Sequence, residues 1–96
     1  MPRRAAKVDA NQGEIVDALR AVGASVECMH AAHGGFPDLV VGYRGVNYLL
    51  EVKSEKGRLT KDQKAWHPAW RGQVAIVRSV EDALIAIGAI EEESDE

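Results

Sequence analysis

Two short runs of sequence decide the fold: residues 37–41 (PDLVV) and 48–53 (YLLEVK). Both consist mainly of apolar and β-branched residues, which are typical of buried strands. Three ionisable side chains interrupt these runs, namely Asp38, Glu51 and Lys53. Because charged side chains are rarely buried without a partner or a task, we expect these three to belong to a site.

The spacing of the three charged residues decides whether they meet. Side chains alternate between the faces of a strand, so Glu51 and Lys53 share one face. If Arg44 and Gly45 form a two-residue hairpin turn, paired residue numbers sum to 89 and Asp38 lies opposite Glu51. A four-residue turn keeps Asp38 on this face, whereas a three-residue turn does not. An even register therefore gathers two carboxylates and one ammonium, with the cross-strand Cβ atoms about 5 Å apart.

Length and composition indicate one folded domain. The 96 residues suffice for a single core, which we assign to residues 1–90, and residues 91–96 read as a disordered acidic tail. No apolar run approaches the ~20 residues of a membrane span, and no signal-peptide core follows the N-terminus. We therefore expect a cytoplasmic protein with no membrane partner. The single cysteine excludes an internal disulfide.

The charge is distributed unevenly along the chain. The net charge is −3, yet residues 1–90 carry 12 basic and 10 acidic groups. Between residues 44 and 71, seven basic residues stand against three acidic ones, and they flank the candidate site. This pattern favours a nucleic-acid partner, although a solvated surface with routine Lys and Arg explains the charge equally well.

Capping and periodicity place the remaining elements. Asn11 and Glu14 predict a capping box that opens a helix ending at Gly23. The apolar stripe of this helix would consist of Ile15, Leu19 and Val22. Residues 24–30 predict a first strand, and the loop 31–35 leads to a second strand beginning at Phe36 or Pro37.

The second half of the chain shows the same kinds of signal. Thr60 and Gln63 predict another capping box, and its helix should end or bend near Pro68. Residues 73–78 predict a fourth strand buried on both faces, and Ser79 opens a last helix. The core face of that helix would hold Ala83, Leu84 and Ile87. The order favours an α/β fold with a mixed four-stranded sheet flanked by helices, its fourth strand parallel to the third.

Two carboxylates side by side repel each other and prefer to share a proton or a cation. Oxygen ligands, few in number and with room for water, suit Mg²⁺ or Mn²⁺ better than Zn²⁺. Such an ion can polarise a phosphodiester, and an adjacent lysine can bind the phosphate or orient water. The residues therefore predict a metal-dependent phosphodiester hydrolase that uses no small-molecule cofactor.

The same residues resemble a known family. The pair Pro37-Asp38 followed by Glu51-Val52-Lys53 is similar to the PD-(D/E)XK signature of the restriction-endonuclease-like superfamily. With residues 35–39 (GFPDL) and 57–63 (GRLTKDQ), the chain resembles the virus-type replication-repair nuclease domain in its small stand-alone phage form. The resemblance extends over residues 11–88 and implies a restriction-endonuclease-like fold in a phage or prophage protein.

The resemblance also implies roles for individual residues. Asp38, Glu51 and the carbonyl of Val52 would bind the metal, with Glu14 as an additional acid near it. Lys53 would be the catalytic lysine, and Gln63 would pack toward the site. Relatives of this family include Holliday-junction resolvases, so branched, flap or junction DNA is the expected substrate and a homodimer the expected assembly. The expected DNA contacts are Gly34, Gly35, Lys56, Arg58, Lys61 and Lys64.

Simpler interpretations remain open for several of these residues. The charged triplet could be a surface ion cluster, and Glu14 and Gln63 could act only as capping residues. Cys28, His30 and His33 could bind zinc, although a fourth ligand is not evident. Trp66 and Trp70 could serve the core or an interface, or else stack on bases. The alternative function is a non-catalytic nucleic-acid-binding or assembly module that retains the nuclease fold.

Overall fold

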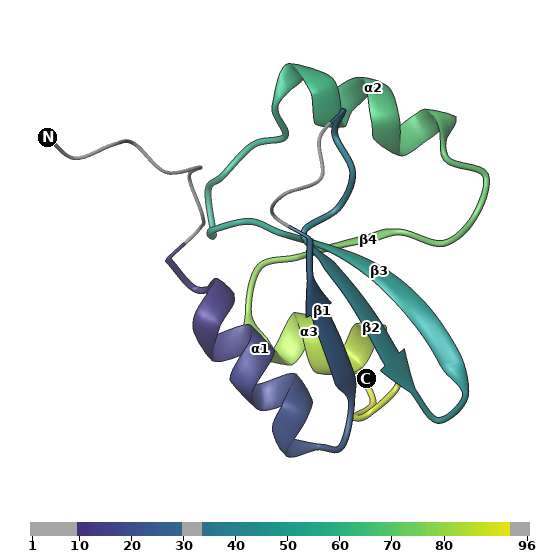
Figure 1. The fold of residues 1–96 in the computed structure, drawn as a ribbon. Coiled ribbons are helices and arrows are strands. Elements are labelled where there is room, and N and C mark those ends of the chain that lie inside the picture. Colours follow the sequence, from purple (N-terminus) through teal and green to yellow (C-terminus); the bar gives the residue numbers. More distant parts are fainter. Residues whose placement is uncertain (1–9, 30–33, 93–96) are drawn as a thin grey trace, which may run out of the picture.

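The computed structural model describes residues 10–29 and 34–92. Within them the elements follow the expected order, helix, three strands, helix, strand, helix (Figure 1). The helices are α1 (Gln12–Ala21), α2 (Lys61–Ala69) and α3 (Val80–Ala86). The strands are β1 (Ser25–Cys28), β2 (Leu39–Tyr43), β3 (Val46–Val52) and β4 (Ala75–Val77). The predicted α/β fold with a mixed four-stranded sheet is thus confirmed.

The sheet has the strand order β1-β2-β3-β4, and only β4 runs parallel to its neighbour. Tyr43 pairs with Val46, so the β2–β3 hairpin has the register in which paired numbers sum to 89. Arg44 and Gly45 form its turn with φ values of 53° and 81°, the two positive values of a type I′ turn. The expected even register is therefore confirmed.

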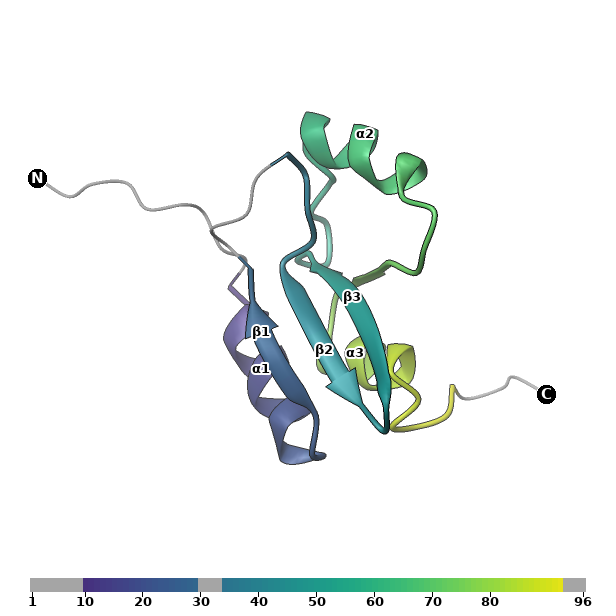
Figure 2. The same cartoon turned by 45° about the vertical axis from the view of Figure 1, so that its right-hand side comes forward.

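The core lies on one face of the sheet. Helices α1 and α3 pack against each other and against the outer strands β1 and β4, and Figure 2 shows both helices on the same side of the sheet. Alternate residues of β2 and β3 face the two helices, and those that are fully buried are Leu39, Val41, Leu50 and Val52. The apolar stripe of α1 and the buried positions of α3 complete this core; they are Ile15, Val16, Leu19, Ala83 and Ile87.

Helix α2 stands apart from the other two helices. In Figures 1 and 2 it lies beyond the end of the sheet that is farthest from the hairpin turn. Its start is a complete capping box: Thr60 Oγ1 accepts from the Gln63 amide, and Gln63 Oε1 accepts from the Thr60 amide. The helix ends at Ala69, directly after Pro68, as expected.

The first helix corrects two predictions. Asn11 is the N-cap residue, but its side chain makes no capping hydrogen bond, so the predicted capping box with Glu14 is wrong. Val22 is 38% exposed and does not belong to the apolar stripe, because the helix has already ended at Ala21. Gly23, with φ of 98°, closes the helix as predicted.

Strands β1, β2 and β4 are shorter than predicted. Strand β2 begins at Leu39 instead of Phe36 or Pro37, because the preceding segment leaves the sheet to pack against α2. At Gly35 a Cβ atom would lie 2.5 Å from the Asp62 carbonyl oxygen, so only glycine permits this approach. Strand β4 lies at the sheet edge, and its Ile76 is 39% exposed. The prediction that β4 is buried on both faces is therefore wrong.

Several predictions concern residues outside the described part of the chain. These include His30 and His33 of the possible zinc group, most of the loop 31–35, and residues 93–96 of the acidic tail. Glu91 and Glu92 are exposed. No helix among the described residues is long and apolar enough to cross a membrane.

Candidate active site

The carboxylate of Glu51 is the centre of the candidate site. It projects from the end of β3 on the face opposite the core, yet the residue is fully buried because α2 covers this end of the sheet. Gln63 Nε2 donates a hydrogen bond of 2.9 Å to Glu51 Oε2. Lys53 Nζ lies 3.9 Å from the same oxygen. Burial of a charged carboxylate is costly without such partners, so these contacts hold it in place.

Lys53 follows β3 and is held by the neighbouring strand. Its amide donates to the Val77 carbonyl at 3.0 Å, and its side chain is 10% exposed. The loop after it is fixed by Arg78, whose Nη1 donates to the carbonyls of Ser54 and Gly57, each at 2.7 Å. The ammonium group is therefore aimed at Glu51 from a well-anchored backbone.

Asp38 reaches the site from the residue before β2. Its Oδ2 accepts a 2.9 Å hydrogen bond from the Val52 amide. Because the N–H and C=O of a strand residue point to the same neighbour, the Val52 carbonyl also faces the Asp38 side. The register places Asp38 across from Glu51, as predicted, and its carboxylate contacts the β3 backbone.

Gln63 performs both of the roles considered for it. Its Oε1 accepts from the Thr60 amide in the capping box, while its Nε2 donates to Glu51. The start of α2 and the buried carboxylate are thus joined through one amide group.

His67 belongs to this group but was missed by the sequence analysis. Its Nε2 lies 3.7 Å from Glu51 Oε1, beyond hydrogen-bond length, and its side chain is 11% exposed. Burial lowers the pKa of His67 below 6.5, and the charge of Lys53 acts in the same direction. Both effects favour the neutral form of the imidazole. His67 lies four residues after Gln63 on α2, and this spacing was the available signal.

Asn11 is a second residue that the sequence analysis assigned differently. Its Nδ2 donates to the carbonyl of Lys53 at 3.2 Å and to that of Arg78 at 3.1 Å. The start of α1 is thereby tied to the ends of the two parallel strands β3 and β4, beside the catalytic candidate Lys53. Nothing in the local sequence distinguishes this long-range contact from an ordinary helix cap.

The donor atoms at this end of the sheet have the chemistry that Mg²⁺ or Mn²⁺ prefers. They are the carboxylates of Asp38 and Glu51 and the carbonyl of Val52, all oxygen donors. In residues 10–29 and 34–92, no three Asp, Glu, His or Cys side chains gather closely enough to hold a metal ion. Because Mg²⁺ keeps several waters and commonly uses one or two carboxylates plus substrate phosphate, this pair of carboxylates fits such an ion.

The remaining predicted site residues lie around this centre or away from it. Glu14 is exposed on α1 and forms no three-donor group with the two carboxylates. The lysines and arginine expected to contact DNA are all exposed; they are Lys56, Arg58, Lys61 and Lys64. Gly34 and Gly35 both have positive φ, at 76° and 89°. Cys28 is a free, exposed cysteine at the end of β1.

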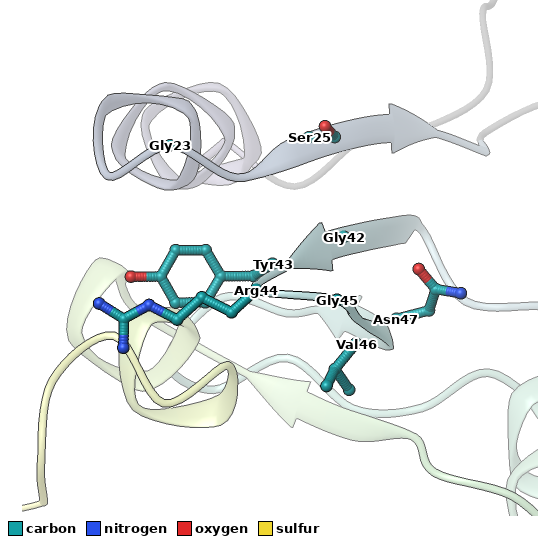
Figure 3. Close-up of a pocket in the computed structure, with 8 residues that line it drawn as sticks. All are labelled: Gly23, Ser25, Gly42, Tyr43, Arg44, Gly45, Val46 and Asn47. Carbon is teal, nitrogen blue, oxygen red and sulfur yellow. The ribbon is translucent and has the colours of Figure 1, made fainter.

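A second region lies at the far end of the sheet. There the hairpin turn and the start of β1 surround a hollow of about 360 Å³, drawn in Figure 3. The Arg44 guanidinium lies 5.0 Å from the centre of the Tyr43 ring, and the two side chains extend alongside each other. The lining holds no acid, histidine or lysine, so it offers no side-chain carboxylate or imidazole to a metal ion; its members are Gly23, Ser25, Gly42, Tyr43, Arg44, Gly45, Val46 and Asn47.

Known proteins similar to this chain are nucleases or nuclease domains by name. A solved structure described as a VRR_NUC domain matches with a TM-score of 0.62 and 28% identity, covering 78% of this chain and 94% of that one. A Fanconi-associated nuclease 1 homolog from Arabidopsis thaliana is 45% identical over 51 residues, which cover 41% of this chain and 6% of the relative. This chain thus spans only a small part of that relative.

No protein-family model matches the sequence. The structural match nevertheless extends over most of this chain and nearly all of the solved domain. It agrees with the family resemblance carried by Asp38, Glu51 and Lys53. The chain therefore has the fold of a VRR_NUC domain, and part of its sequence is similar to the Fanconi-associated nuclease 1 homolog.

Proposed function

We propose that this protein is a Mg²⁺- or Mn²⁺-dependent DNA endonuclease that acts on branched, flap or junction DNA. The observation that supports this most strongly is the buried Glu51 carboxylate, held by Gln63 and accompanied by Lys53 and Asp38. A solvated surface ion cluster would be exposed, whereas the side chains of Glu51 and Lys53 are 1% and 10% exposed. This burial argues against a routine ion cluster.

The side chains divide the work of the reaction. Asp38, Glu51 and the Val52 carbonyl would hold the metal ion, which supplies Lewis-acid activation of the phosphodiester and its nucleophilic water. Lys53 presents a positive charge to the scissile phosphate, or hydrogen-bonds the attacking water, and so stabilises the charge that develops there. Gln63 keeps the Glu51 carboxylate oriented, since its amide is itself anchored to the N-cap of α2.

The exposed basic residues after β3 supply the electrostatic attraction for DNA. Lys56 and Arg58 lie in the loop behind Lys53, and Lys61 and Lys64 lie on α2. Both segments border the site, so phosphates on either side of the cut would meet positive charge. The binding that results should weaken steeply as salt is added.

The deciding experiment is cleavage of single-stranded, duplex, flap and four-way-junction DNA with several divalent metals. Wild-type protein should cut branched substrates only when Mg²⁺ or Mn²⁺ is present. Lys53→Ala should lose cutting while it still binds DNA, because it removes one charge close to the reacting phosphate. Arg44→Asn is the control for loss of one positive charge, because Arg44 is an exposed cation at the hairpin end of the sheet, away from the carboxylates.

Two outcomes would contradict this proposal. Wild-type rates in Lys53→Ala would remove that residue from the reaction. Metal-independent, salt-sensitive binding with no cleavage of any substrate would instead identify a non-catalytic binding module.

We further propose that the protein acts as a homodimer. One small domain offers little surface to a branched duplex, and two strands require two sites. Sedimentation of the protein alone and with junction DNA tests this directly. If the protein were a monomer both alone and with junction DNA, the homodimer proposal would be wrong.

A further inference from the structure

A groove on the same face of the sheet as the candidate site has no assigned role. Its volume is about 360 Å³, and it is lined by Phe36, Val40, Asn47, Leu49, Trp70 and Gln73. Four of these six side chains are apolar and none is charged. The volume is at the small end of the range of about 300–1,000 Å³ that holds small ligands.

The groove begins next to the two carboxylates. Val40 lies two residues after Asp38, and Leu49 lies two residues before Glu51. Residues two apart on a strand share a face and lie about 7 Å apart. When the scissile phosphate lies at the carboxylates, the base of the adjacent nucleotide is therefore within reach of the groove.

The aromatic side of the groove is rigid. Trp66 and Trp70 stack with ring centroids 4.9 Å apart and planes 16° apart, and Phe36 meets Trp66 edge-on at 5.4 Å. Trp70 nevertheless stays 42% exposed, with its indole N–H donated to the Gln73 carbonyl at 3.0 Å. The Gln73 amide is fixed in turn by both backbone groups of Leu49. Trp70 thus presents a fixed aromatic surface.

The surrounding charge indicates what kind of group enters. The groove itself is uncharged, while exposed Arg71 follows Trp70 directly and exposed Lys64 lies on the same helix. An apolar slot bordered by cations suits a planar base attached to a phosphate backbone. A second copy of this chain would bring the same cations against its partner, which makes it the less complementary occupant.

We propose that this groove binds an unpaired nucleobase of the DNA strand that is cut, adjacent to the scissile phosphate. The proposal rests on the nuclease function proposed above and specifies its substrate. A base within a continuous duplex would have to unpair and unstack before it could enter, and this carries an energetic cost. Flaps, gaps and junctions already offer unpaired bases, so the groove would favour binding of these structures over continuous duplex.

The test places 2-aminopurine, a base whose fluorescence falls on stacking, at successive positions of a flap substrate. Binding is measured with Lys53→Ala, so that the DNA stays intact and the groove stays unaltered. Fluorescence should fall sharply at one position next to the cleavage point. Quenching that is equal at all positions, or absent at all of them, would overturn the proposal.

A groove variant gives the second readout. Trp70→Ala in the Lys53→Ala background should weaken flap binding about 5- to 150-fold, the range expected for loss of one base–aromatic stack, and change duplex binding less than about 2-fold. Trp70→Phe should restore most of the difference. An equal loss on flap and duplex, or a change of sedimentation from dimer to monomer, would overturn the proposal, the latter by making the groove an interface between copies.

Wild-type cleavage of the same flap with Mg²⁺ or Mn²⁺ separates the two proposals. Cleavage without position-specific quenching would leave the nuclease function standing and remove the base site. Quenching without cleavage would retain a base-binding site and remove the nuclease function on which its catalytic placement depends.

Discussion

The two faces of the central hairpin carry alternate residues of the same two strands and have opposite properties. On one face, Leu39 and Leu50 are fully buried beneath α1 and α3. On the other face, Glu51 is fully buried as well, but its neighbour in β4, Ile76, is 39% exposed. The first face is covered except near the hairpin turn, where Val46 is 49% exposed, whereas the second is covered by α2 only where the carboxylates lie. Burial on the second face therefore marks the candidate site.

The largest effect should follow from Glu51→Gln, which removes a charge while keeping the side-chain volume. We expect cleavage to fall at least about 10³-fold, because a metal-binding carboxylate becomes an amide at the reacting centre. The folded state should tolerate the change, since an amide is cheaper to bury than a carboxylate. Single-turnover cleavage and thermal unfolding of the same preparation measure both. A loss of less than about 10-fold would contradict the assignment of Glu51.

The adjacent residue tests the opposite face. Leu50→Ala should lower the free energy of unfolding by about 2–5 kcal/mol, because it removes fully buried methyl groups and leaves a cavity. Cleavage per folded molecule should change far less than in Glu51→Gln when measured well below the unfolding transition. Denaturant unfolding provides the stability. A cleavage loss as large as that of Glu51→Gln, in protein that remains folded, would show that the two faces are not separable.

A smaller effect should distinguish the two roles of Gln63. Gln63→Ala removes the hydrogen bond to Glu51 and should lower cleavage about 10- to 100-fold, as for other residues that orient a metal ligand. Thr60→Ala is the control, because it removes only the hydrogen bond that the Thr60 hydroxyl accepts from the backbone N–H of Gln63. It should cost about 1 kcal/mol of stability and leave cleavage nearly unchanged. Equal cleavage losses in both variants would mean that Gln63 acts only through the helix cap.

The sequence was sufficient where local rules act alone. The period-two alternation and the Arg44-Gly45 turn determine the hairpin register, and with it the side on which Asp38, Glu51 and Lys53 lie. Thr60 and Gln63 form the predicted capping box because both partners are three residues apart. These features needed no knowledge of the rest of the chain.

The sequence was not sufficient where a side chain chooses a distant partner. Asn11 has the spacing of a cap, yet it donates to carbonyls 42 and 67 residues away. His67 joins Glu51 only because α2 folds over the end of β3. The apolar run of β4 could not reveal that, within the described residues, Ile76 stays 39% exposed on the second face. In each case tertiary packing decides the contact, and local sequence rules do not determine it.

The smallest effect should come from the exposed part of the second face. Ile76→Thr should change the free energy of unfolding by about 0.5 kcal/mol or less, since the side chain is 39% exposed and threonine keeps the β-branch. Val77→Thr is the matched control one residue along β4, where the side chain is 1% exposed and a hydroxyl would enter the core. It should cost at least about 1 kcal/mol. Denaturant unfolding of both variants measures the difference. If Ile76→Thr were as costly as Val77→Thr, the second face would be covered in solution, and a second copy of this chain on that face would be the first explanation to test by sedimentation.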